Sequence, residues 1–405
     1  APSLASVLMI FPVVKGIKTN LKVLLTDKLN LFLLSASIIM IFKSCINSFF
    51  LFNEIENWTP VLNWIGLSNW IPLFIVFLGT QIYVQNQIQR ELFAKILILG
   101  TVPIVFSCLS QYFLKWYGPY ELLNGFIIWF QRPITEINQP ITGLFNNPNY
   151  AGAWLAIVWP FLLSYLQKKR IDGNKSKIII VFIFSVLFII SISLINSRAA
   201  WLGIITSLPL VFGKNVFFWL LPLILITISS VLLCVIPIFP ENIQNLFCYL
   251  IPSNFLSNFN DLSISFENLS RFSIWKKALL LILEKPLLGW GAASFPLIYF
   301  FEMGQWKGHP HNLFLELSIS YGIITSILVF TFFGIIIFRT YRTIYSNKNN
   351  KNNFKRSWWT ASIVFFLVHS FDIVYFDLRI SIIFWILIAG LKGMLNERNQ
   401  KLTYS

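Results

Sequence analysis

Long apolar runs constrain this chain more than any other feature. The run VFFWLLPLILITISSVLLCVIPI, residues 216–238, is one of several such segments. It exceeds the roughly 20 apolar residues that a helix needs to cross a bilayer. Backbone polar groups inside lipid must be satisfied within the segment, which leaves helices or a closed barrel. The runs do not alternate apolar with polar residues as barrel strands do. The sequence therefore predicts an all-α polytopic integral membrane protein.

About ten spans are expected, with ten to twelve as the range. They cover approximately residues 31–52, 66–86, 93–114, 151–167, 178–196, 199–213, 216–238, 312–338, 357–376 and 380–396. The composition agrees, because 56% of the residues are hydrophobic and only 12% are charged. A soluble domain is about 25% charged. We treat residues 1–405 as a single transmembrane domain.

Basic residues are distributed unevenly between the predicted loops. With the N-terminus inside, most of the 31 Lys and Arg residues fall in cytoplasmic segments, as the positive-inside rule requires. Both termini are then cytoplasmic, and the segments 115–150 and 239–311 face outward. The net charge of +15 is explained by topology and calls for no nucleic-acid partner.

The larger outer loop, residues 239–311, is expected to be partly helical. It contains RFSIWKKALLLILEKPLLGWG, whose apolar core of Ala278 to Leu283 is too short to span. Trp and Lys flank this core, which favours a helix lying in the outer membrane interface. The four cysteines lie in or beside apolar runs without CxxC spacing, so buried thiols are expected.

Two of the three histidines stand directly before an apolar run, in GHPHNLFLELSISYGI, residues 308–323. A neutral imidazole can accept a proton near pH 7 and later return it, so His311 is a candidate general base. Asn312 is positioned to cap the following helix. Zinc would need three or four ligands, and neither an HExxH helix nor a nearby cysteine accompanies His309 and His311. No metal and no cofactor are therefore expected. A purely capping or interface-anchoring histidine is the alternative.

The helix after His311 has a small polar face. At 100° per residue Ser318, Gly322 and Thr325 fall on the same side as His311, which suits close helix approach beside a cavity. The stretch GLFNNPNYAGAW, residues 143–154, is a strong turn signal, and a rigid turn before the next span is the simpler interpretation.

Three arginines on the predicted outer side could bind an anion. Arg198 lies in the short turn INSRAAWLG, Arg271 precedes the interfacial helix, and Arg379 follows Asp372 and Asp377. A guanidinium is always charged, and its donors match phosphate oxygens. Lipid phosphates could instead hold Arg198, and either aspartate could form a local salt bridge with Arg379. The sequence has no Walker A loop and no GxGxxG motif, so any reaction would use a donor already on the outer side.

Together these motifs resemble the O-antigen ligase family of bacterial membrane glycosyltransferases. The family's signature is matched by His311-Asn312, nine residues, Gly322, two residues and Thr325. The segments NSRAAWLG, RFSIWKKAL…EKPLLGWGAASF and NNPNYAG are also similar to the family. The resemblance covers roughly residues 140–395.

The resemblance implies an enzyme of lipopolysaccharide biosynthesis in the bacterial inner membrane. It would transfer a glycan from an undecaprenyl-diphosphate-linked donor to a hydroxyl of lipid A-core or a growing glycan on the periplasmic side. Transfer would be inverting and metal-independent. Carried over to this chain, Arg198 and Arg271 would hold the diphosphate and His311 would deprotonate the acceptor. Arg379, Asn312 and His309 complete the expected substrate-binding set.

An inorganic anion transporter is the competing hypothesis. Some cyanobacterial relatives that share the arginine turn carry a bicarbonate-transport label, and Arg198 with Arg379 would then form the substrate site. Transporters usually show inverted repeats and broken helices at midplane, whereas the candidate residues here gather on the outer side.

Overall fold

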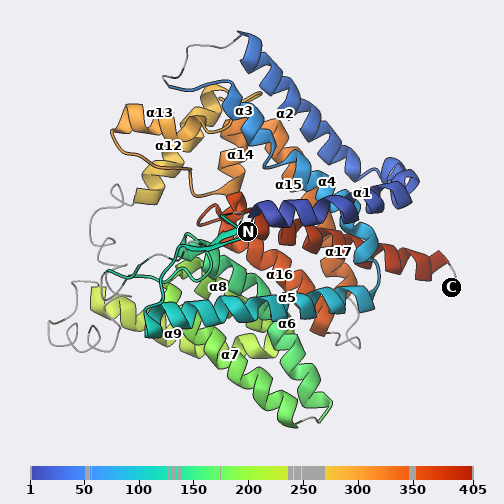
Figure 1. The fold of residues 1–405 in the computed structure, drawn as a ribbon, viewed down its shortest axis with the longest axis vertical. Helices are drawn as coiled ribbons and strands as arrows, with labels where there is room; N and C mark the ends of the chain where they lie inside the picture. The colour runs from blue at the N-terminus through green and yellow to red at the C-terminus, as the bar shows by residue number, and fades with distance from the viewer. Residues whose placement is uncertain are drawn as a thin grey trace.

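The chain is helical almost throughout in the computed structural model (Figure 1). The structure describes residues 2–50, 55, 57–125, 127–129, 131, 133–135, 139–173, 175–235, 240, 248, 270–345 and 353–403. The α-helices are α1 (Pro2–Thr26), α2 (Asn30–Phe50), α3 (Val61–Leu67), α4 (Ile71–Thr80), α5 (Gln87–Leu109), α6 (Pro148–Ile171), α7 (Lys175–Ile195), α8 (Arg198–Phe212), α9 (Lys214–Val235), α12 (Ser270–Glu284), α13 (Ser294–Met303), α14 (Leu313–Tyr321), α15 (Ile323–Tyr345), α16 (Asn353–His369) and α17 (Leu378–Thr403). Short 3-10 turns cover Gln81–Tyr83 and Val374–Phe376, and a π-helical turn, Ser110–Leu114, extends α5.

A multi-pass membrane protein follows from the length and apolarity of these helices. Among the described residues, 6 helical segments could cross a bilayer: Asn30–Phe49, Val61–Tyr83, Gln87–Leu114, Lys175–Ile195, Ile323–Tyr345 and Leu378–Glu397. The predicted count of about ten is not confirmed. The other four predicted spans correspond to α6, α8, α9 and α16, which are not among these segments. Two of them are short, since α8 has 15 residues and α16 has 17.

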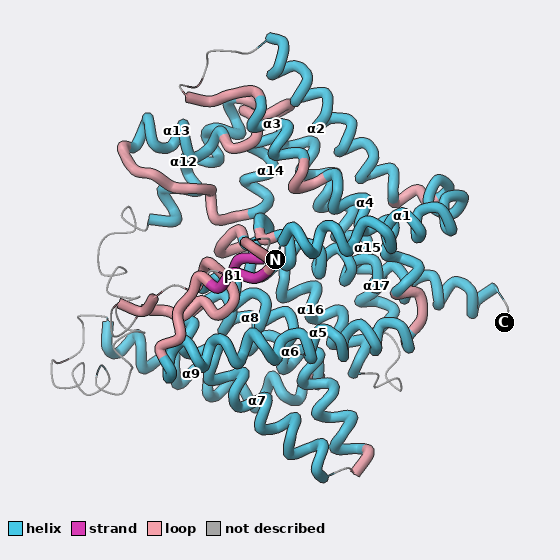
Figure 2. Tube along the Cα trace, viewed as in Figure 1, coloured by secondary structure: helices cyan, strands magenta, loops and turns pink. Residues whose placement is uncertain are grey.

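A small β-hairpin departs from the all-α expectation. Strands β1 (Tyr120–Leu122) and β2 (Ile127–Trp129) pair antiparallel, with Glu121 opposite Ile128. The hairpin lies in the predicted outer segment 115–150, between α5 and α6 (Figure 2, magenta). Leu123, Asn124 and Gly125 at its tip all have positive φ, so the chain reverses in a tight turn. Strands of three residues leave little alternation to detect in a sequence.

Helix α17 is the centre of the bundle. In Figure 1 it runs between α4 and α15 on one side and α6 and α16 on the other, and 83% of its span is buried. Its Trp385 ring packs edge-on against Phe77 at 5.9 Å and tilted against Phe333 at 5.2 Å. Aromatic pairs at these spacings add to the stabilisation that burial gives. The middle of α17 is therefore fixed in an aromatic core.

Charged groups pair at one end of the bundle, away from the histidines. The pairs are Arg90–Glu397 at 2.7 Å, Lys168–Glu91 at 2.9 Å and Lys392–Asp27 at 2.7 Å. They join the start of α5 to the end of α6 and to α17, and they join α17 to the turn between α1 and α2. At the other end of the bundle, the start of α17 contacts the segment that leads into α6, because Arg379 Nη1 donates to Leu144 O. Which of the two ends faces the cytoplasm stays a prediction.

The helix that begins after His311 is interrupted, contrary to the single span predicted at 312–338. Gly322, with φ of +88°, separates α14 from α15. The turn of residues 286–291, which follows α12, packs into this break. Ile323 N donates to Pro286 O at 2.8 Å, and Trp290 N donates to Ile319 O at 2.7 Å. A Cβ on Gly322 would overlap the Leu287 carbonyl. The close approach expected on this face is therefore made by a turn, not by a neighbouring helix.

The predicted outer loop 239–311 is described at residues 240, 248 and 270–311, while its remaining residues lie outside the described part of the chain. The expected interfacial helix is present as α12, followed by α13. Cys45 and Cys108 are free, as expected, but Cys248 is disulfide-bonded, which corrects the expectation of a thiol there.

Candidate active site

His311 is held in a turn between α13 and α14. Its φ of +52° is left-handed, an unusual conformation for a residue with a side chain. The next residue begins the helix, because Asn312 Oδ1 accepts from Phe314 N at 3.0 Å and Leu315 N at 3.2 Å. The expected cap is therefore confirmed. The fixed helix start holds the imidazole of His311 at the N-terminal end of α14, where 28% of the side chain is exposed.

Asp372 is the partner of His311. This carboxylate lies in the loop after α16, and its Oδ1 is 3.1 Å from His311 Nδ1. An ionised carboxylate only accepts hydrogen bonds, so Nδ1 carries the proton. Nε2 is then the unprotonated nitrogen of the neutral ring. This is the arrangement in which a histidine can take a proton from a substrate.

Asp372 is itself fixed by α6. Asn149 Nδ2 donates to Asp372 Oδ2 at 2.5 Å, while Oδ1 also accepts from Ile373 N at 2.9 Å. Burial alone would raise the pKa of Asp372, but the hydrogen bond from His311, the neighbouring histidines and the Ile373 amide bring its pKa below the usual range. The carboxylate therefore stays ionised and can stabilise a positive charge on the imidazole.

His309 contributes to the same cluster as a neutral ring. Its Nδ1 accepts from His311 N at 3.2 Å, and its Nε2 is 3.5 Å from Asp372 Oδ1. Burial, reinforced by repulsion from His311 when that ring is protonated, lowers the pKa of His309 to about 4 although Asp372 opposes the shift. His309 therefore supports the backbone and the carboxylate and does not compete with His311 as a base at neutral pH.

The same three side chains could also chelate a metal ion. One ligand atom from each of His309, His311 and Asp372 lies within 4.8 Å of the others. Three protein ligands with an open position are typical of a catalytic zinc site. The donor set thus fits a metal as well as a hydrogen-bonded base, and the two roles exclude each other because both use the His311 ring.

Arg379 is held by an acid, as one of the two sequence interpretations anticipated. Its Nε and Nη2 donate to the two oxygens of Asp377 at 3.0 Å and 2.5 Å. Nη1 donates to Leu144 O at 3.1 Å, and the guanidinium stacks 4.0 Å above the Phe145 ring. Arg379 therefore joins the start of α17 to the segment that leads into α6.

Arg198 is the first residue of α8 and is exposed. Its turn packs on α6, since a Cβ on Gly152 would lie 2.8 Å from Ser197 Cβ. Gly152 is three residues after Asn149, so both share one face of α6. One short stretch of α6 therefore contacts both the Arg198 turn and, through Asn149, the carboxylate that faces His311.

Arg271 is exposed in the first turn of α12. Four residues later on the same face, Trp275 Nε1 donates to Pro310 O at 3.0 Å. Pro310 directly precedes His311, so α12 is tied to the histidine turn. Arg271 therefore lies on a helix bound to the histidine turn, whereas Arg198 lies in a turn that packs on α6, the helix that binds Asp372.

Sequence reasoning treats Asp372 only as a possible partner for Arg379 and misses its contact with His311. Asn149 was assigned to a structural turn and also belongs to the cluster. The available signal was the polarity of NNPNY and FDIVYFD, two polar stretches beside predicted spans on the outer side. Their pairing depends on which helices are neighbours, and this could not be read from the chain.

Comparison with known proteins supports the resemblance drawn from the motifs. Residues 183–330, which include Arg198, Arg271 and His311, match the family described as O-Antigen ligase. The chain is 27% identical, over 81% of its length and 70% of the relative, to a protein of Rickettsia conorii named as a polysaccharide ligase. It is 26% identical to the ComP-specific O-oligosaccharyltransferase of Acinetobacter baylyi, over 58% of this chain and 40% of the relative. The chain thus spans less than half of the second relative.

Proposed function

We propose, from the O-antigen ligase family match of residues 183–330, that this protein transfers a glycan from an undecaprenyl-diphosphate-linked donor to an acceptor hydroxyl. The acceptor would be lipid A-core or a growing glycan. The observation that carries this proposal is the His311–Asp372 pair, with Nδ1 bound to the carboxylate at 3.1 Å and Nε2 available to a substrate.

The proposed reaction is a single displacement with inversion. His311 Nε2 takes the proton of the acceptor hydroxyl while that oxygen attacks the anomeric carbon of the donor. The bond from this carbon to the diphosphate breaks, and the lipid diphosphate leaves with the electron pair. Asp372 stabilises the imidazolium until its proton passes to solvent. This sequence needs no metal, so we propose a metal-independent transferase.

The leaving diphosphate requires positive charge close to the His311–Asp372 cluster. We propose that Arg198 and Arg271 bind it, because both are exposed, α12 is bound to the histidine turn, and the Arg198 turn packs on α6, which binds Asp372. Preorganised guanidinium groups stabilise the negative charge that develops on a leaving phosphate. Arg379 would add positive charge beside Arg198 and Arg271, although its guanidinium also pairs with the carboxylate of Asp377. Asn312 and His309 would act beside His311 at the glycan.

We also propose the orientation of the protein in the bacterial inner membrane. The ion pairs among α5, α6 and α17 would face the cytoplasm with both termini, and the His311 cluster would face the periplasm. The functional region would extend from about residue 140 to 395, since Asn149 and Arg379 lie beyond the matched segment. Residues 1–405 would form one transmembrane domain.

The test is reconstitution of purified protein with a defined lipid-diphosphate-linked glycan and a defined acceptor. We expect the glycan to appear on the acceptor with release of lipid diphosphate, and with inverted configuration at the new bond. Arg198→Lys and Arg271→Lys keep the charge but lose the fork, so each should weaken donor binding. Retained configuration, or no transfer to any acceptor, would reject the proposal.

A second assay addresses the transporter hypothesis. Vesicles containing the protein would be tested for uptake of radiolabelled bicarbonate, with empty vesicles as the control. We expect no uptake above the control. Uptake that is lost in Arg198→Ala, together with failed glycan transfer, would favour the transporter.

A further inference from the structure

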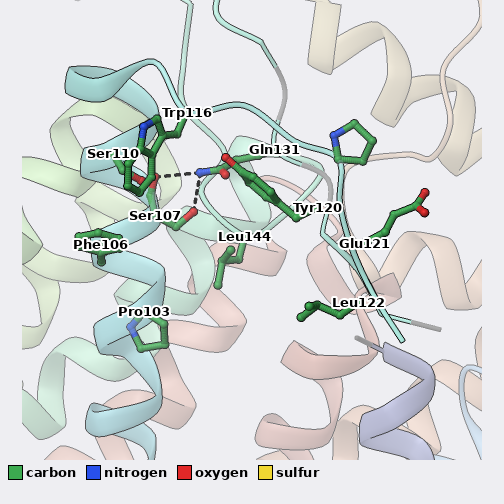
Figure 3. Close-up of a pocket in the computed structure, with 11 residues that line it drawn as sticks. Pro103, Phe106, Ser107, Ser110, Trp116, Tyr120, Glu121, Leu122, Gln131 and Leu144 are labelled. Atoms are coloured by element: carbon green, nitrogen blue, oxygen red, sulfur yellow. Dashed lines mark hydrogen bonds between the residues drawn. The ribbon is translucent and has the colours of Figure 1, made fainter. Parts of the chain in front are cut away.

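A cavity of about 890 Å³ lies beside the candidate site, between α5 and the β-hairpin. One wall is the outer part of α5 and its π-helical extension, with Pro103, Phe106, Ser107 and Ser110. Tyr120 and Leu122 of β1 face this wall, as Figure 3 shows. The cavity falls within the size range of small-molecule sites.

The α5 wall belongs to a predicted membrane span. Residues Gln87–Leu114 form one of the segments long and apolar enough to cross a bilayer, and the cavity occupies its last part. From Pro103 to Ser110 the helix rises about 10 Å. The cavity therefore extends from the outer end of the span down into the depth of the outer leaflet.

The cavity is chemically suited to hydrocarbon. Phe106, Trp116 and Leu122 line it and are respectively 59%, 51% and 48% exposed. Exposed apolar side chains gathered in one hollow mark a site for an apolar ligand. Tyr120 and Leu122 point toward α5, whereas Glu121 between them points away, as alternation along a strand requires (Figure 3).

Polar groups of the α5 wall are already used within the protein. Gln131 Nε2 donates to Ser107 O at 2.9 Å and to Ser107 Oγ at 2.5 Å (Figure 3). Ser110 Oγ also donates to Ser107 O, at 3.1 Å. Among the lining residues that the structure describes, none is Lys or Arg. The cavity thus offers no cation to a diphosphate, and the carboxylate of Glu121, which also belongs to the lining, points away from α5 (Figure 3). An apolar chain is the occupant that this lining suits best.

One residue of the cavity lining belongs to the segment that contacts the candidate site. Leu144 lines the cavity, and its carbonyl accepts from Arg379 Nη1 at 3.1 Å. Five residues later, Asn149 binds the Asp372 carboxylate. A donor with its diphosphate bound by the proposed arginines would have its lipid tail descending into the membrane, and this cavity is a path adjoining that site.

We propose that the cavity binds the first isoprenoid units of the donor's lipid tail. The inference rests on the proposed glycan transfer, and it assigns the hairpin of residues 120–129 a role in holding the donor. The diphosphate is bound elsewhere, by the arginines, so tail and headgroup make separate contributions to donor affinity.

The experiment compares two donors that carry the same glycan diphosphate. One is esterified with the C55 isoprenoid and the other with a methyl group. In Leu122→Asp, a charge enters the apolar wall, and we expect the KM for the C55 donor to rise at least about tenfold. The KM for the methyl donor and both kcat values should be unchanged. Leu123→Asp is the matched control, because Leu123 is 73% exposed and does not line the cavity.

Each other outcome has a definite meaning. An equal rise in KM for both donors would overturn the inference in favour of a sugar site, and no change for either would place the tail elsewhere. A wild-type protein that transfers neither donor would instead reject the proposed function. As a direct readout, a C55 donor with a diazirine in its first unit should crosslink wild-type protein within residues 103–122. A diazirine phospholipid that crosslinks there and is not displaced by the donor would also overturn the inference.

Discussion

His311 and Asp372 are separated by 61 positions in the chain, yet His311 Nδ1 lies 3.1 Å from Asp372 Oδ1. The contact joins the start of α14 to the loop that follows α16. It sets the tautomer of the histidine and supplies a counter-charge for its protonated form. Several expected outcomes depend on this pair.

Replacing His311 by Ala should abolish most glycan transfer. A positioned base contributes about 10²–10⁴-fold, so a loss in that range is expected, with donor binding retained. The measurement is initial transfer rate in the reconstituted assay, with thermal melting to verify folding. His311→Gln is the matched variant, since it keeps a polar group but cannot act as a base. Near-normal transfer in a folded His311→Ala protein would contradict the mechanism.

Asp372→Asn should lower kcat by more than about tenfold and by no more than the loss from removing the base itself. An asparagine can still hydrogen-bond, but it does not favour the proton on Nδ1 and gives no charge to an imidazolium. Asp377→Asn serves as the control because Asp377 pairs with Arg379 and not with the histidines. Equal losses of kcat in the two variants would argue that Asp372 is merely structural.

Chelators should leave transfer unchanged. The proposed base mechanism needs no ion, although His309, His311 and Asp372 could hold one. Transfer would be measured after exhaustive treatment with EDTA and again after adding back Zn²⁺. Added Zn²⁺ is expected to inhibit, because it would occupy the His311 ring. If EDTA abolished transfer and Zn²⁺ restored it, the cluster would be a metal centre.

Stability should decrease in mild acid partly because of His309. This ring has a pKa of about 4 in the folded protein, against about 6.5 in an unfolded chain. Between these values the unfolded chain binds more protons, so the free energy of unfolding falls as pH is lowered through this window. Thermal melts at pH 7.5 and pH 5 should show a smaller pH-dependent loss of Tm in His309→Asn than in the wild type. An unchanged pH dependence would show that His309 titrates normally.

Gly322→Ala should destabilise the protein. The residue has φ of +88°, and its added Cβ would overlap the Leu287 carbonyl. We expect a clear fall in Tm and in folded yield. Gly334→Ala is the matched control, since no atom lies within 4 Å of where its Cβ would be. A Tm equal to that of the control would mean that the turn at residues 286–291 adapts freely.

Local features of the fold were predictable from sequence. The cap at Asn312, the helix now seen as α12 and an acid beside Arg379 follow from spacing over a few residues. Such features depend on bonds within one turn of a helix, which sequence patterns report well.

The remaining features depend on contacts between distant segments. Gly322 suggested close approach on a continuous helix, whereas the turn beginning at Pro286 makes the approach and breaks the helix. The Asp372–Asn149 bond requires that α6 lie beside the loop after α16. The count of about ten spans is not confirmed among the described residues, where two of the corresponding helices, α8 and α16, are short, with 15 and 17 residues. Burial within the bundle can satisfy such helices, and composition alone does not distinguish them from spans.

The nine residues of α14 are bounded on both sides, by the Asn312 side chain at one end and by Gly322 at the other. Because both ends are fixed, the length of α14 sets the distance and the rotation between His311 and Gly322. One inserted residue would rotate His311 by about 100° and move it about 1.5 Å relative to the turn at Gly322. The number of residues between the histidine and the glycine of the signature therefore sets the direction in which the imidazole faces.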